Sequence, residues 1–216
     1  MKLNPFLGAT APHRKSVWAI AAGLSFALVT SSACAVANLD QPAPTFSAPA
    51  ASGGTISLEQ YRGKTVVLEW TNHDCPFVKK HYESGNIPSL QKDAVGKGIV
   101  WLQVISSAPG KQGHVDGATA LKLNADRGAA PTGTVLDPDG KVGRLYEAVT
   151  TPHIFIVNPD GKLVYKGGID SVASSKKDDI AKADNYVKLA LNDLAGGKKP
   201  AHASTQPYGC TVKYAN

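Results

Sequence analysis

The sequence lacks a glycine repeat, a basic stripe and a glycine-rich nucleotide motif, and each absence excludes a class of protein. Its 21 glycines follow no triplet period, so the chain is not collagen-like. Basic and aromatic residues do not alternate along any stretch, so we expect no nucleic-acid partner. No GxGxxG or P-loop pattern occurs, so we expect no organic cofactor. The 216 residues, 43% hydrophobic and 19% charged, are typical of one globular domain.

The N-terminal apolar run is too short to cross a membrane. It covers residues 17–29, whereas a spanning helix needs about 20 residues. The run follows basic residues and precedes Ala35-Val36-Ala37, which has the form of a signal-peptidase site. We therefore predict an export signal over residues 1–37, cleaved after Ala37. The product is expected to be periplasmic or secreted, with no stable membrane insertion after cleavage. Lipidation at Cys34 and an uncleaved anchor are the alternatives.

Cysteine is scarce, with only 3 residues, and Cys34 falls within the predicted signal. Cys75 and Cys210 remain after cleavage. In an oxidising compartment, two cysteines form either a structural disulfide or a catalytic thiol with its partner. The cysteine count leaves both possibilities open.

Buried strands and helices alternate along the predicted domain, residues 38–196. Apolar, β-branched runs predict strands at residues 65–70, 99–105, 134–136, 153–157 and 163–165. Helical spacing predicts helices at residues 76–95 with an interruption at 85–88, and at 114–124, 141–148 and 178–195. This order predicts an α/β protein with a mixed central sheet flanked by helices. Residues 197–216 form a polar tail that carries Cys210.

Cys75 stands where a helix is predicted to begin. It follows a buried strand and precedes Pro76, which suits the first turn of a helix. The helix dipole and the free N–H groups at that end stabilise a thiolate. Lys79 and Lys80 add positive charge nearby, whereas Asp74 opposes the effect. This position favours a reactive thiol, with a buried inert cysteine or half of a static disulfide as the alternatives.

Residues 68–80 (LEWTNHDCPFVKK) resemble the active-site strand, turn and helix of thioredoxin-fold proteins. The closest branch is the redoxin family, which contains thiol peroxidases and periplasmic thiol-disulfide reductases. Thr151-Pro152, before the strand at 153–157, resembles the cis-proline segment that faces the active-site cysteine. The resemblance implies a thioredoxin-like fold and a peptide-binding edge at Thr151 and Pro152. It also implies that Glu69, six residues before Cys75, is a buried proton relay.

The sequence departs from both familiar redox patterns. Val78 stands where thioredoxins have the second cysteine of C-x-x-C. Asn72 and Pro152 stand where peroxiredoxins have the threonine and arginine that contact the peroxide. An arginine elsewhere, Arg127 or Arg144, could take that role only if a loop carried it to the site. Cys210 supplies the missing resolving thiol if the tail folds back onto Cys75.

His73 and His153 suggest a different class of function. Both stand near motif residues and are predicted to line the thiol pocket together with Asn72. Cysteine and histidine ligands suit copper or zinc, and some thioredoxin-fold proteins carry copper. Those carriers use C-x-x-x-C-P, and Thr71 replaces the first cysteine here, so we expect no metal site. A non-redox peptide-binding module on the same fold is a further alternative.

The favoured interpretation is thiol–disulfide exchange in redox homeostasis, with Cys75, Cys210 and Glu69 as the catalytic residues. Thr151, Pro152, Asn72, His73 and His153 are the predicted substrate-binding residues. The expected partners are protein or small-molecule disulfides and thiols. A peroxiredoxin-type thiol peroxidase is the main alternative, and a copper carrier or a binding module comes next.

Overall fold

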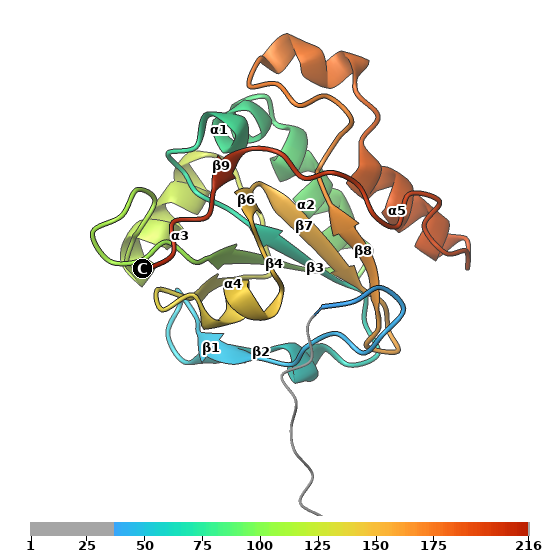
Figure 1. Ribbon diagram of the computed structural model, residues 1–216, viewed down its shortest axis with the longest axis horizontal. Coiled ribbons are helices and arrows are strands. Elements are labelled where there is room, and N and C mark those ends of the chain that lie inside the picture. The colour runs from blue at the N-terminus through green and yellow to red at the C-terminus, as the bar shows by residue number, and fades with distance from the viewer. Residues whose placement is uncertain (1–36, 216) are drawn as a thin grey trace, which may run out of the picture. The chain divides into compact units, whose positions relative to one another are not determined.

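A five-stranded mixed sheet forms the centre of the computed structural model, which describes residues 37–215 (Figure 1). The predicted export signal, apart from Ala37, lies outside the described residues. Ala37 itself is buried, and its carbonyl oxygen accepts a hydrogen bond from Lys166 Nζ at 3.3 Å. Among residues 37–215, no helix is long and apolar enough to cross a membrane.

The central sheet has the strand order β5-β4-β3-β7-β8. The strands are β3 (Val66–Trp70), β4 (Val100–Ile105), β5 (Gly133–Leu136), β7 (His153–Val157) and β8 (Leu163–Gly167). β3, β4 and β5 run parallel, whereas β7 pairs antiparallel with β3 and β8 antiparallel with β7. The predicted mixed sheet with flanking helices is therefore confirmed.

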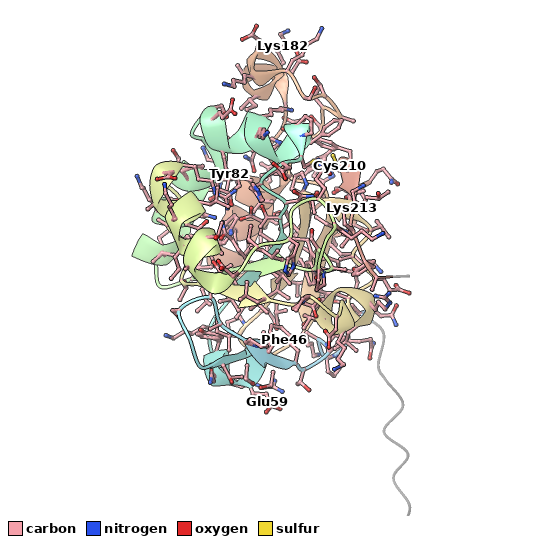
Figure 2. The ribbon with its side chains drawn as sticks, turned by 90° about the vertical axis from the view of Figure 1, so that its left-hand side faces the viewer. Phe46, Glu59, Tyr82, Lys182, Cys210 and Lys213 are labelled. Carbon is pink, nitrogen blue, oxygen red and sulfur yellow. The ribbon has the colours of Figure 1, made fainter. Side chains whose placement is uncertain are left out.

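Other elements cover both faces of the sheet. Successive side chains of a strand point to opposite faces, and every residue of β3 is buried, so each face is packed against a layer. On the face of Val67 lie α1 (Pro76–Glu83), α2 (Asn86–Gly96) and α5 (Tyr186–Ala195). On the face of Leu68 lie β1 (Ser47–Pro49), β2 (Thr55–Ser57), the 3₁₀ helix η1 (Leu58–Tyr61) and α4 (Lys141–Leu145). Figure 2 shows Phe46 and Glu59 in this second layer, well away from Cys210.

The helix between β4 and β5, α3 (Gly117–Asp126), begins later than the predicted residue 114. Asp116 ends the preceding loop because its carboxylate accepts the Thr119 N–H at 2.8 Å and caps the helix. Asn124 joins α3 to β5 by donating to Thr134 Oγ1 at 3.0 Å.

The predicted single helix at residues 178–195 is wrong. The segment contains a 3₁₀ helix, η2 (Lys177–Lys182), and then α5. Local side-chain bonds make the break, because Asn185 accepts the Lys188 N–H at 2.9 Å and Ser171 Oγ accepts the Asp184 N–H at 2.9 Å. The helix predicted at residues 141–148 also ends early, at Leu145, and Glu147 has φ 54°.

The C-terminal tail folds back onto the domain. β9 (Cys210–Thr211) pairs antiparallel with β6 (Thr150–Thr151), as Figure 1 shows beside α1. Upstream, the Thr205 N–H donates to Lys166 O at 3.2 Å, and downstream the Val212 N–H donates to Val149 O at 3.1 Å. We call residues 207–211 the strap.

Candidate functional site

Cys75 caps the N-terminus of α1, as the sequence predicted. Pro76 occupies the first turn, and the Cys75 N–H donates to Asn72 O at 3.1 Å. The Cys75 side chain is 0% exposed, and its thiol donates to Thr151 O at 3.1 Å. The sulfur therefore lies against the segment that precedes Pro152.

The Thr151–Pro152 peptide bond is cis, which confirms the prediction. Thr151 is buried and belongs to β6, and its register partner in β9 is Cys210. Thr151 Oγ1 also donates to Cys210 O at 3.4 Å. The strap therefore occupies the edge at which the family resemblance places a bound peptide.

Cys75 and Cys210 are adjacent in space, and both are free thiols. Burial raises the pKa of the Cys75 thiol, but hydrogen bonds outweigh burial and hold this pKa below its usual value. The main donors are the Cys210 thiol and the backbone N–H groups of Val78 and Cys210. Burial raises the pKa of Cys210 to about 11, and its hydrogen bond to Cys75 and the Cys75 charge act in the same direction. The pair is therefore asymmetric, with the thiolate favoured on Cys75.

Glu69 is a fully buried acid in β3. Its carboxylate accepts hydrogen bonds from Tyr82 Oη at 2.6 Å, Trp101 Nε1 at 2.7 Å and Gln91 Nε2 at 3.1 Å. Burial raises the pKa of Glu69, although the Tyr82 hydrogen bond, the Arg127 charge and the other two donors oppose this. None of its hydrogen bonds goes to a cysteine.

Sequence reasoning missed the residues around Glu69. Tyr82 Oη also accepts from Gln103 Nε2 at 2.6 Å, and the Arg127 guanidinium lies 3.7 Å from the centre of the Tyr82 ring. One signal was available, because Gln103 is a polar residue in the middle of an otherwise apolar strand. A buried polar group of this kind needs a buried partner.

Asn72 and His73 have structural partners beside Cys75. Asn72 is buried, its Oδ1 accepts the Asp74 N–H at 2.9 Å, and its Nδ2 donates to Gln112 O at 3.3 Å. Gly113, with φ 84°, lies so close that a Cβ there would overlap the Asn72 side chain. His73 is partly exposed, and its Nε2 lies 3.5 Å from Asp74 Oδ2. Neither side chain hydrogen-bonds the Cys75 sulfur.

The predicted approach of His153 to the thiol is not what the structure shows. In β7, side chains alternate between faces, and Ile154 packs in the cluster of Cys75. His153 lies on the other face, with its ring centre 4.4 Å from that of Phe155. Burial lowers the pKa of His153 to about 3, so the ring is neutral. Val149 N–H donates to its Nδ1 at 3.4 Å.

The comparisons with known proteins give the family. Residues 39–166, more than half of the chain, match the model of the AhpC/TSA family. The chain belongs to the AhpC/TSA family. Among curated proteins, none matches this AhpC/TSA chain.

Solved structures share the fold of this AhpC/TSA protein. An uncharacterized conserved protein from Geobacillus kaustophilus has 22% identity and a TM-score of 0.70, over 82% of this chain and 93% of that one. A hypothetical protein from Sinorhizobium meliloti 1021 has 21% identity and a TM-score of 0.64, over 82% and 95%. A provisionally assigned protein disulfide isomerase from Bacteroides thetaiotaomicron has 16% identity and a TM-score of 0.52, over 74% and 91%.

Neither candidate arginine contacts Cys75 in this AhpC/TSA protein. Arg127 stacks on Tyr82 and donates to Asn124 Oδ1 at 2.8 Å. Arg144 lies 4.6 Å from the Tyr214 ring centre and donates to Ala215 O at 2.7 Å. Within residues 37–215, no three His, Cys, Asp or Glu side chains gather as a metal ion would require.

Proposed function

We propose that the protein is a thiol–disulfide oxidoreductase in which Cys75 is the nucleophile and Cys210 the resolving cysteine. One observation carries the proposal: the Cys75 sulfur, at a helix N-terminus and hydrogen-bonded by Cys210, lies against Thr151 O beside cis-Pro152. A static structural disulfide is a weaker interpretation, because both cysteines are free and their pKa values are displaced in opposite directions.

The reaction proceeds in two exchanges. The Cys75 thiolate attacks one sulfur of the substrate disulfide, so a Cys75–substrate disulfide forms and one substrate thiolate leaves. Cys210 then loses its proton and attacks the Cys75 sulfur, so the Cys75–Cys210 disulfide forms and the second substrate thiolate leaves. The substrate gains two electrons and the two cysteines lose two. An external dithiol, oxidised in turn to its disulfide, restores both thiols.

The asymmetry of the two thiols matches these roles. A thiolate is the attacking species, and Cys75 is the cysteine whose pKa is lowered. Cys210 stays protonated until Cys75 loses its negative charge in the mixed disulfide. Because the Cys75 charge is one cause of the raised Cys210 pKa, forming the mixed disulfide makes Cys210 easier to deprotonate. Glu69 is the buried acid to which the family resemblance assigns proton relay.

The proposed partners are protein or small-molecule disulfides and thiols outside the cytoplasm. The basic N-terminal residues, the apolar run and the Ala35-Val36-Ala37 site support export to the periplasm or medium, with cleavage after Ala37. Mass spectrometry of the exported protein tests this part. A chain that begins at Asn38 is expected, and an exported chain that begins at Met1 contradicts it.

Mixing the reduced protein with oxidised glutathione tests the chemistry. The wild type is expected to form the Cys75–Cys210 disulfide and to release two glutathione molecules. Cys210→Ser is expected to stop at a glutathione adduct on Cys75, and Cys75→Ser to give neither product. Intact mass with peptide mapping distinguishes these states. Equal reactivity of Cys75→Ser and wild type contradicts the role of Cys75 as nucleophile, and a wild type that gives neither product favours a non-redox binding module.

A further inference from the structure

The strap is fixed on both sides of Cys210 and contacts a cysteine that has no exposed surface. Cys75 is 0% exposed beneath the β6–β9 pairing. Gly209, with φ 138°, passes so close to Thr151 that a Cβ would overlap its carbonyl oxygen. An external disulfide therefore cannot reach the Cys75 sulfur while the strap is in this position.

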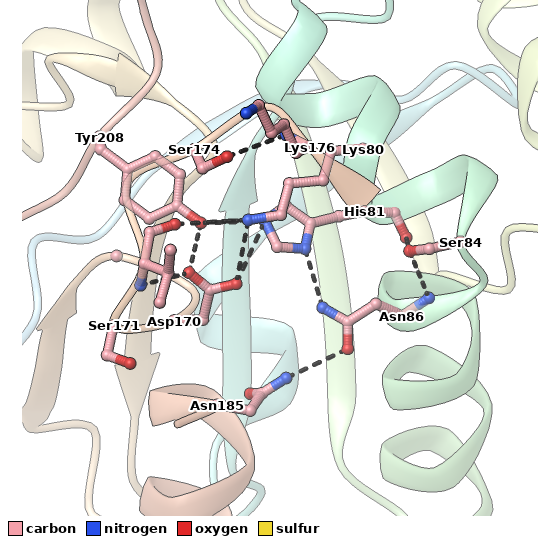
Figure 3. A network of polar contacts seen from close by, with 12 residues as sticks. Lys80, His81, Ser84, Asn86, Asp170, Ser171, Ser174, Lys176, Asn185 and Tyr208 are labelled. Atoms are coloured by element: carbon pink, nitrogen blue, oxygen red, sulfur yellow. Dashed lines mark hydrogen bonds and ion pairs between the residues drawn. The ribbon is translucent and has the colours of Figure 1, made fainter. Parts of the chain in front are cut away.

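Contacts hold the strap on both sides of Cys210. Downstream, the Val212 main-chain N–H donates to Val149 O at 3.1 Å, and the Tyr214 side-chain hydroxyl donates to Ala148 O at 2.8 Å. Upstream, the Thr205 N–H just outside the strap donates to Lys166 O at 3.2 Å, and inside the strap the anchor is the hydroxyl group of Tyr208. It lies between Lys80, His81 and Asp170, which we call the Tyr208 socket (Figure 3).

Each group of the Tyr208 socket points at the hydroxyl. Tyr208 Oη donates to Asp170 Oδ1 at 2.5 Å and lies 3.1 Å from His81 Nε2 and 3.5 Å from Lys80 Nζ. Lys80 Nζ lies 3.5 Å from Asp170 Oδ2, and His81 Nε2 lies 3.7 Å from the same atom. All three socket side chains are at least 97% buried, because Lys80 is 1%, His81 0% and Asp170 3% exposed.

A second layer of contacts fixes the protonation of His81. Burial lowers the pKa of His81 to about 4, so the ring is neutral at neutral pH. Asn185 Nδ2 donates to Asn86 Oδ1 at 3.2 Å, which turns the Asn86 amide nitrogen toward His81 Nδ1 at 2.8 Å. Nδ1 is therefore the acceptor, and Nε2 carries the hydrogen that it donates to Tyr208 Oη. The hydroxyl thus accepts from His81 and donates to Asp170.

Such a socket is costly to bury, and nothing in the proposed chemistry uses it directly. Removing Lys80 and Asp170 from water costs free energy that their attraction only partly returns. Both Lys80 and His81 belong to α1, the helix that Cys75 caps, whereas Asp170 follows β8. The socket therefore joins the strap to the helix that positions the nucleophile.

We propose that Tyr208 is the positioning residue of the exchange reaction: its release from the socket exposes Cys75, and its return brings Cys210 back. This inference rests on the proposed function. With Tyr208 docked, Cys210 is only two residues away, so its Cα stays within about 7 Å of the Tyr208 Cα. The same hydroxyl contact thus opposes the first exchange and promotes the second.

Tyr208→Phe tests this trade-off, because it removes the hydroxyl and keeps the ring that packs on Phe77 at 5.8 Å. An aromatic disulfide that releases a coloured thiolate is mixed with the reduced protein. The first thiolate reports attack by Cys75, and the second reports attack by Cys210 on the mixed disulfide. A hydrogen bond to a charged partner changes an equilibrium about tenfold or more. We expect the first phase to become about tenfold faster and the second about tenfold slower.

The controls separate this role from general loosening. Tyr186→Phe removes a tyrosine hydroxyl from α5 outside the strap and is expected to leave both phases unchanged. Cys210→Ser removes the second phase and identifies the first as the Cys75 reaction. Thermal unfolding shows whether each variant is folded.

Three results decide whether Tyr208 positions Cys210 for the exchange reaction. Opposite changes in the two phases support the positioning role of Tyr208. Two unchanged phases, or two phases changed in the same direction, overturn it while leaving the proposed exchange intact. A wild-type protein whose Cys75 releases no thiolate contradicts the proposed function itself and the inference that rests on it.

Discussion

The hydrogen bond between the two thiols is the contact whose removal most directly tests the proposed nucleophile. Among the groups that lower the pKa of Cys75, the Cys210 thiol contributes most, and burial acts in the opposite direction. Cys210→Ala removes this donor, whereas Cys210→Ser keeps a hydroxyl donor at the same position. The two variants are therefore a matched pair, and neither can form the disulfide.

The size of the effect follows from the charge of the acceptor. A hydrogen bond to an ionised group contributes about 1.5–3 kcal/mol, and 1.4 kcal/mol corresponds to a factor of ten. Cys75 is fully buried, so solvent does not replace the lost donor at once. The backbone donors of Val78 and Cys210 remain in both variants. We expect the Cys75 ionisation constant of Cys210→Ala to be at least about tenfold smaller than that of Cys210→Ser.

The rate at which iodoacetamide alkylates Cys75, measured as a function of pH, reports the fraction of Cys75 that is thiolate. Losing the donor raises the pKa of Cys75, so the profile of Cys210→Ala moves to higher pH than that of Cys210→Ser. Comparing the two variants cancels any change in access caused by a looser strap. Coincident profiles would refute the view that the Cys210 thiol stabilises the Cys75 thiolate.

Three further predictions concern the buried acid, the strap and peroxide. Burial raises the pKa of Glu69 above 4.5, so the folded state holds this proton more tightly than the unfolded chain does. The Glu69 contribution to the free energy of unfolding is therefore full below pH 4.5 and is lost as pH rises through the folded-state pKa. In urea unfolding, Glu69→Gln is expected to lack this loss. Equal pH dependence of the free energy of unfolding in the variant and the wild type would contradict this prediction. Gly209→Ala, where a Cβ would overlap Thr151 O, is expected to slow formation of the Cys75–Cys210 disulfide, measured by gel-shift trapping, about tenfold or more. Gly197→Ala, with φ +70° and open space, is its control, and equal rates for the two variants would count against the strap. Without an arginine at Cys75, stopped-flow oxidation by hydrogen peroxide is expected to be about 10³-fold slower than in an efficient peroxiredoxin, and fast oxidation that Arg127→Ala abolishes would make the protein a peroxidase.

Local sequence patterns correctly predicted the elements whose conformation depends mainly on residues nearby in the chain. β3, β4 and β7 are predominantly apolar runs, each with one polar residue, and such runs are typical of strands buried on both faces. The helix predicted at residues 178–195 failed because Asn185 offers its own hydrogen bond to the backbone. Hydrophobic spacing does not register such a competing cap.

The site residues likewise divide into those that short segments predict and those whose position depends on the strand geometry. Cys75 at a helix start, Glu69 in a buried strand and cis-Pro152 before β7 are features of short segments, and each was predictable. His153 was misplaced because a strand residue next to a motif residue points to the opposite face.

The sequence by itself determined the family, the mixed sheet and the position of Cys75 before α1, because these depend on residue order over short stretches. Only the tertiary structure decided that the tail pairs Cys210 with Thr151 and that Tyr208 meets Lys80, His81 and Asp170. These contacts join segments about 40 to 130 residues apart in the chain. No local periodicity encodes them, because they depend on which sheet edge remains free and which buried charges need a partner once the core has packed.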